Sequence, residues 1–252
     1  MYKLSEENKG GVMEKRCLSR KIEVFTFLAA ILLTIGTTVF AVTAAVADDA
    51  QDSKQLVELA KLTLDKFVTA KDNEPFLNLL RRAKGIFIAP QILKGAFVFG
   101  LSGGSGVFVT RDESGEWGGP AFYTIGSASF GLQIGGQASE VILLAMTDRG
   151  VTALLGSSIK LGADVGIAMG PVGAGAAAAT ANLSADIISF ARSKGLFAGI
   201  SLDGAIVKVR EGLNEAYYGK MADPKDILIK RDVKNPDAEG LLHQVSEAAG
   251  KD

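Results

Sequence analysis

The stretch that decides the fold is GIFIAPQILKGAFVFGLSGGSGVFVT, residues 85–110. Its short apolar runs, such as Ile86-Phe87-Ile88, are interrupted every few residues by glycine, serine or proline. Apolar runs of this length, bounded by turn residues, are typical of β-strands. The same texture continues to residue 219, and 25 of the 30 glycines lie between residues 85 and 219. So many glycines favour bulges and close backbone approach, as in a strongly curved sheet or a closed barrel.

Several turns are expected between these strands. Residues 111–116 and Ser193-Lys194-Gly195 suit hairpin connections, and Asp203-Gly204 carries a strong turn signal. We expect Gly103-Gly104-Ser105-Gly106 to be a glycine turn between two strands, or alternatively a loop whose backbone amides contact a lipid phosphate. The strand candidates are residues 86–89, 96–99, 107–110, 140–147, 187–191, 197–202 and 205–209.

Helical patterns lie on both sides of the glycine-rich region. Asp52 begins a capping-box pattern, and apolar residues then follow at helical spacing, which predicts an amphipathic helix over residues 53–70. Pro75 suits the first turn of a second helix that stops at Gly85, and Asn235-Pro236 begins a helix in the tail. The predicted fold is therefore α+β, with a glycine-rich, mostly antiparallel, strongly curved or barrel-like β core and flanking helices.

The N-terminus has the features of a targeting segment. Residues 1–23 form a basic region, and residues 24–47 contain no charge and are long enough to span a bilayer. Ala45-Val46-Ala47 is a small-x-small pattern that suits cleavage after Ala47 by signal peptidase. Residues 24–47 are therefore either a signal peptide or a retained anchor. In both cases we expect an exported domain over residues 48–220 and a helical tail over residues 221–252, in the periplasm or at its membrane face.

Composition excludes several classes of function. A net charge of −1 provides no general footprint for nucleic acid. With one cysteine (Cys17) and one histidine (His243), the chain cannot build a Cys/His zinc cluster. Ser157-Ser158-Ile159-Lys160 has the S-x-x-K form of serine acyl-enzymes but lacks the companion motifs. We therefore predict no catalytic residue, no metal site and no cofactor.

A basic cluster next to an apolar strand is the best candidate for a binding site. Arg81, Arg82 and Lys84 precede Ile86, and each cation near an anionic membrane surface contributes about 1 kcal/mol. The alternative is that these residues complement the dipole at the C-terminus of a helix. Trp117, the only tryptophan, follows an expected hairpin and lies either at a headgroup interface or in the core.

Read in order, a set of short motifs between residues 53 and 220 resembles the SYLF domain family of lipid-binding proteins. The matching segments are Ala83-Lys84-Gly85-Ile86, Pro90, Lys94-Gly95-Ala96-Phe97, Gly103-Gly104-Ser105-Gly106-Val107, Trp117 with Pro120-Ala121-Phe122, residues 129–137, residues 161–164, residues 170–173, residues 193–199, and Asn214 with residues 216–219.

The resemblance implies a non-enzymatic, membrane-associated module. Members of this family bind lipid partly through an N-terminal amphipathic helix and neighbouring basic residues, and some fungal members bind actin filaments. The residues that correspond here are Lys54, Lys61, Lys66, Arg81, Arg82, Lys84 and Lys94. The glycine segment Gly103, Gly104, Ser105 and Gly106 and the single Trp117 complete the set of candidate lipid-binding residues.

Partners follow from the same resemblance. We expect anionic membrane phospholipids, no nucleic acid and, because the export segment suggests a bacterial protein, no actin. An envelope scaffold that self-associates or binds another envelope protein is the alternative. Ser102 stands where some eukaryotic members have a basic residue, so selectivity for phosphoinositides is not expected to carry over.

Overall fold

A single curled sheet organises the computed structural model, which describes residues 48–96, 99–130, 135–171, 184–193, 196–198 and 202–250. The predicted basic region over residues 1–23, the apolar segment over residues 24–47 and the cleavage point after Ala47 lie outside these ranges. Among the described residues no helix combines the length and apolar character needed to cross a bilayer. Residues Asp49–Asp252 form one compact unit.

Within these described ranges nine strands build the sheet, in the order β5-β9-β3-β2-β1-β4-β7-β6, with β8 added beside β7. Every pair is antiparallel except β6 with β7. The prediction of an α+β fold with a mostly antiparallel, strongly curved sheet is confirmed. The strands are β1 (Gly85–Ala96), β2 (Phe99–Arg111), β3 (Trp117–Phe130), β4 (Gly135–Ala145), β5 (Ser158–Lys160), β6 (Ile167–Met169), β7 (Ile187–Ser193), β8 (Leu196–Ala198) and β9 (Ile206–Val209).

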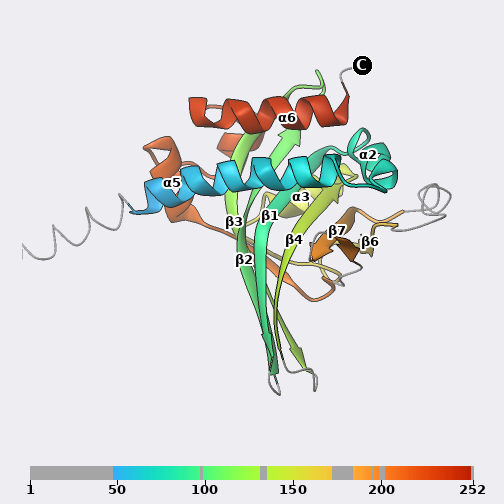
Figure 1. Ribbon diagram of the computed structural model, residues 1–252. Coiled ribbons are helices and arrows are strands. Elements are labelled where there is room, and N and C mark those ends of the chain that lie inside the picture. The colour runs from blue at the N-terminus through green and yellow to red at the C-terminus, as the bar shows by residue number, and fades with distance from the viewer. Residues whose placement is uncertain are drawn as a thin grey trace, which may run out of the picture. The chain divides into compact units, whose positions relative to one another are not determined.

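Helices cover the upper part of this sheet in Figure 1, and β1 to β4 run on beyond them. A helix over residues 48–68 lies beside α6, and Lys54 of the former pairs with Asp237, which lies just before α6. The other helices are α2 (Glu74–Leu80), α3 (Asp148–Leu154), α5 (Glu211–Tyr218), the π-helix η2 (Asp226–Lys230), the 3-10 helix η3 (Pro236–Ala238) and α6 (Glu239–Ala249).

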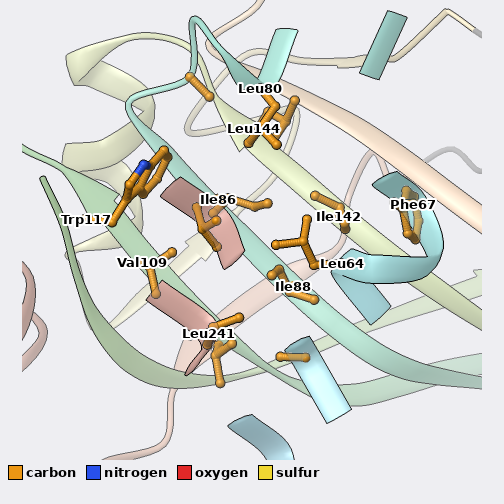
Figure 2. Close-up of a cluster of buried hydrophobic side chains, with 14 of the residues drawn as sticks. Leu64, Phe67, Leu80, Ile86, Ile88, Val109, Trp117, Ile142, Leu144 and Leu241 are labelled. Carbon is orange, nitrogen blue, oxygen red and sulfur yellow. The ribbon is translucent and has the colours of Figure 1, made fainter. Parts of the chain in front are cut away.

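Alternate side chains of each strand point to opposite sides, and in the covered part of the sheet each side is buried in its own core. Ile86 and Ile88 of β1 pack with Leu64, Leu241 and Trp117 on the side of the 48–68 helix, as Figure 2 shows. Phe87 and its neighbours pack on the other side, against α3, β5, β9 and η2. All residues of both cores lie between residues 56 and 249, so residues 48–252 contain the whole described core.

The glycine run at residues 103–106 is not a turn, so that prediction is wrong. These residues lie inside β2, where they face a bulge of β1 at Pro90 and Gln91. A Cβ atom at Gly104 would lie only 2.1 Å from the carbonyl oxygen of Gln91. Glycine is therefore required here so that the backbones of two strands can approach closely.

Four other local points differ from the predictions. The 48–68 helix is already formed at Asp52, so Asp52 is not its N-cap, and α2 ends at Leu80 rather than near Gly85. β3 was not among the predicted strands. The predicted strand over residues 96–99 falls where β1 ends and β2 begins, with residues 97–98 outside the described ranges.

Candidate functional site

A cleft of about 480 Å³ opens between the 48–68 helix and the sheet. One wall is the helix, and the others are the β1 bulge, β4 and β7. Leu59 and Leu62 of the helix make one end of the lining apolar. Glu140 and Arg192 make the other end charged, where β4 pairs with β7. The residues of the lining are Leu59, Leu62, Thr63, Lys66, Pro90, Gln91, Ala138, Ser139, Glu140 and Arg192.

The charged end of the cleft contains one carboxylate between two cations. Glu140 of β4 lies 2.5 Å from Lys66 Nζ and 3.6 Å from the guanidinium of Arg192, its neighbour across the β4–β7 pair. The Arg192 side chain is only 10% exposed, and its guanidinium carbon lies 5.5 Å from the ring centre of Phe67 and 6.0 Å from that of Phe197. Aromatic faces and a carboxylate thus hold a nearly buried arginine at the cleft wall.

At the apolar end of the cleft, and on the sheet next to it, several leucine side chains are largely exposed to solvent. Leu59 and Leu62 of the helix are 49% and 56% exposed, and Leu93 and Leu101 on the sheet are 56% and 68% exposed. Leu93 pairs directly with Ala138, which lines the cleft, so the sheet surface continues from the cleft. We call these four leucines, which lie in and next to the cleft, the apolar ramp.

The other face of the same strands is polar. Lys94 lies opposite Ser102 in the β1–β2 register, and Ser102 and Ser127 share a hydrogen bond of 2.8 Å between their hydroxyl oxygens. Among the described residues beyond the helices, β1 and β2 therefore have one apolar and one polar face, and the ramp lies on the side of the 48–68 helix.

The predicted cations are distributed over separate places. Arg81, Arg82 and Lys84 lie together, and Arg111 joins them by donating a hydrogen bond of 3.2 Å to the carbonyl oxygen of Arg81. We call these four residues the basic edge. Three of them, Arg82, Lys84 and Arg111, line a hollow of about 300 Å³ together with Asp112, Glu113 and Asp148. Lys84 pairs with Asp148 at 2.6 Å. These acidic residues thus compensate much of the positive charge of the basic edge.

The lysines of the 48–68 helix point in different directions. Lys54 pairs with Asp237 at 3.0 Å, and Lys61 lies beside Gly240, so both face the α6 end of the molecule. Only Lys66 lines the cleft. Lys54 and Lys66 are twelve residues apart, which is about 18 Å along a helix. These lysines do not form one patch with the basic edge.

The remaining predicted site residues lie within the sheet or in the core. Gly103, Gly104, Ser105 and Gly106 lie within β2, and Ser105 accepts a hydrogen bond of 2.9 Å from Arg210. Trp117 is 9% exposed and belongs to the core on the helix side. Of the two alternatives for this tryptophan, the structure shows the buried one.

Sequence reasoning missed Glu140, Arg192 and the role of Leu59 and Leu62. Nothing near Glu140 or Arg192 in sequence marks them, because β4 and β7 bring them together with Lys66 only in the fold. Leu59 and Leu62 are three residues apart on the helix, which was a usable signal for a second apolar face.

The S-x-x-K motif that was weighed as catalytic lies at β5: Ser158 and Lys160 belong to this strand, and Ser157 directly precedes it. In β5, the backbone N–H of Lys160 donates to Asp164, and the carbonyl oxygen of Ser157 accepts from Val209. His243 is exposed on α6 and lies 3.5 Å from Glu247. Among the described residues no group of histidine, cysteine or acidic side chains is placed to hold a metal ion.

Comparison with known proteins shows a matching family and related proteins in yeast. Residues 126–248 match the family described as "Ysc84: Las17-binding protein actin regulator". Protein YSC84 of Saccharomyces cerevisiae is 34% identical over 175 residues, which is 68% of this chain and 37% of that protein. LAS seventeen-binding protein 3 of the same yeast is also 34% identical over 175 residues, 68% of this chain and 38% of that protein.

A human protein is similar to a comparable extent. SH3 domain-containing YSC84-like protein 1 of Homo sapiens is 31% identical over 166 residues, which is 65% of this chain and 48% of that protein. The chain thus spans less than half the length of these three curated relatives.

The fold and the cleft define an α+β domain with an amphipathic surface. The comparisons then identify the family: this chain is a SYLF-domain protein of the Ysc84 type. The family description and the name of LAS seventeen-binding protein 3 describe binding and regulatory proteins. Actin regulation appears in the family description, which weighs against our expectation that actin is no partner.

Proposed function

We propose that this domain is a non-enzymatic module that associates with anionic phospholipid surfaces. The observation that supports this function best is the exposure of Leu59 and Leu62 beside Lys66 on one helix. A helix that exposes leucines beside cations suits the boundary between headgroups and acyl chains. Each leucine that leaves water completely contributes roughly 1.5–3 kcal/mol.

Apolar contact is expected to contribute more than charge. The basic edge around Arg82 contains acidic neighbours, and Lys84 is already paired with Asp148. Exposed ion pairs and patches of mixed sign attract anionic lipid only over short distances, because salt screens them within about 10 Å. Arg81 and Arg82 therefore assist docking, and the leucines of the apolar ramp anchor it.

We further propose that the domain is exported and acts at the periplasmic face of a membrane. The support is the sequence alone: a basic region over residues 1–23, an uncharged segment over residues 24–47, and a small-x-small pattern before Asp48. An exported domain would meet lipid headgroups rather than actin, and an envelope protein or a second copy of the chain is the alternative partner.

Vesicle flotation of residues 48–252 tests the proposed function, with neutral and anionic vesicles at low and high salt. We expect binding to anionic vesicles that salt weakens only in part. Replacing both Leu59 and Leu62 by serine should weaken binding about tenfold or more, since each loses apolar burial. Met221→Ser is the matched control, because Met221 is 85% exposed and does not line the cleft.

Arg81→Ala with Arg82→Ala should weaken binding at low salt and have little effect at high salt. Absence of binding to both kinds of vesicle would contradict the proposed function. A mass that rises with concentration in that case would favour the scaffold alternative.

A further inference from the structure

We infer that the cleft holds one anionic lipid molecule, with its charged group at Lys66 and Arg192 and its chain along the apolar ramp. This inference rests on the proposed function and deepens it, from contact with a membrane surface to capture of a single lipid. The ligand class is a monoanionic amphiphile: a phosphodiester or carboxylate group attached to an acyl chain.

The charge at the end of the cleft fits one negative group. Lys66 and Arg192 are both within 4.0 Å of Glu140, and the residues that line the cleft include these two cations and one acid, Glu140. A monoanionic headgroup would complete the balance. The guanidinium of Arg192 is held by Phe67 and Phe197, which keeps its planar donors in place for a phosphate or carboxylate.

The floor of the ramp leaves space for a chain. Gly103 lies opposite Leu93 in the register, and Gly95 lies opposite Leu101, so glycines alternate with the exposed leucines. A Cβ atom at Gly103 would find only the carbonyl oxygen of Ile125 within 4 Å, at 3.7 Å. The sheet therefore leaves space beside Leu93 and Leu101, and Ala138, which lies opposite Leu93, connects this space to the cleft.

The geometry favours one lipid over a flat bilayer at this place. The 48–68 helix packs on the face of the sheet and rises about 10 Å above it, which is the diameter of a helix with its side chains. Glu140 and Arg192 thus lie in the corner between helix and sheet, where a planar membrane cannot reach. A single lipid that leaves the membrane can enter this corner.

Calorimetric titration of residues 48–252 with dihexanoylphosphatidylglycerol, kept below its micellar concentration, tests the inference. Native mass spectrometry gives the stoichiometry, which we expect to be one lipid per chain. Dihexanoylphosphatidylcholine and inorganic phosphate serve as the zwitterionic and chain-free ligands, and both should bind at least about fivefold more weakly.

Variants assign the site. Lys66→Gln should weaken binding of the anionic lipid about fivefold or more, and Glu140→Gln should strengthen it by a similar factor because a like charge is removed. Lys61→Gln is the matched control on the same helix, since Lys61 does not line the cleft. The Lys66→Gln arm is independent of folding effects at Arg192, because the Lys66 side chain is half exposed.

Two outcomes would overturn the inference. One is affinity for the anionic lipid that Lys66→Gln and Glu140→Gln leave unchanged. The other is inorganic phosphate binding as tightly as the lipid, which would show a phosphate site without a chain site. Flotation with long-chain vesicles separates these failures from failure of the proposed function: vesicle binding would then persist while capture of a single lipid is absent.

Discussion

Gly104 shows how a single residue shapes this sheet. A Cβ atom there would meet the carbonyl oxygen of Gln91 at 2.1 Å and the Cα atom of Ile92 at 3.2 Å, and backbone atoms cannot rotate away. Gly104→Ala is expected to lower the free energy of unfolding by about 1–3 kcal/mol, as overpacked sites do. Urea denaturation measures it. Gly103→Ala is the matched control and should stay within about 1 kcal/mol; equal losses would contradict the close-approach argument.

Asp112 should make stability depend on pH. The Ser114 hydroxyl donates a 2.6 Å hydrogen bond to its carboxylate, the Glu116 amide donates another, and Arg231 pairs with it. Together these contacts hold the pKa of the Asp112 carboxyl below its usual range. A lowered pKa in the folded state stabilises the protein above the unfolded value of about 3.9, and this stabilisation is lost as pH falls through the folded value.

Thermal unfolding from pH 7 down to about pH 2 therefore tests Asp112→Asn. The variant should have a lower Tm than the wild type at pH 7 and should lose less Tm upon acidification below about pH 4. Parallel Tm curves over the whole range would show that Asp112 does not contribute to acid sensitivity.

On the scale of an element, the 48–68 helix has two faces with different tasks. Leu64 is fully buried against β1, and Leu62 lies on the ramp at 56% exposure. Leu64→Ala should cost about 2–5 kcal/mol of folding free energy, whereas Leu62→Ala should stay within about 0.5 kcal/mol. Denaturant unfolding of the two variants measures this difference, and similar losses would mean that the helix packs differently.

Some elements could be predicted from local sequence and others could not. The Asn235-Pro236 pair correctly predicts a helical start, because the Asn235 side chain accepts a hydrogen bond from the Asp237 amide. The 14-residue strand β3 was missed, since Gly118, Gly119 and Pro120 break its apolar pattern. β3 exists because its long pairing with β2 supplies the backbone hydrogen bonds that its own sequence does not suggest.

For the whole molecule, α6 belongs to the core. Leu241 and Val245 are fully buried in the same cluster as Leu64 and Ile86. Each contributes roughly 1.5–3 kcal/mol by leaving water, against a typical total stability of 5–15 kcal/mol. Deletion of residues 239–252 should therefore abolish cooperative thermal unfolding or lower Tm sharply. A truncated chain with an unchanged Tm would contradict this packing.

The same scale explains why the candidate site escaped sequence reasoning. The sequence predicted a basic cluster at residues 81–84, which is local, and in the structure Arg82 and Lys84 line one hollow. The cleft joins Lys66, Glu140 and Arg192, which are more than 50 residues apart from one another. The β4–β7 pairing brings Glu140 beside Arg192, and the packing of the 48–68 helix on the sheet brings Lys66 to Glu140; neither arrangement leaves a short motif in the chain.

The packing of the 48–68 helix beside α6 has a consequence for how the chain folds during its synthesis. Gln244 reaches Asp65 at 3.5 Å, so residues nearly 180 positions apart close the same core. A chain synthesised from its N-terminus must wait for α6 before the helix side of the sheet is covered, and contacts of such long range form slowly. The nascent polypeptide thus keeps an uncovered apolar sheet until α6 has been synthesised, which gives chaperones time to engage it.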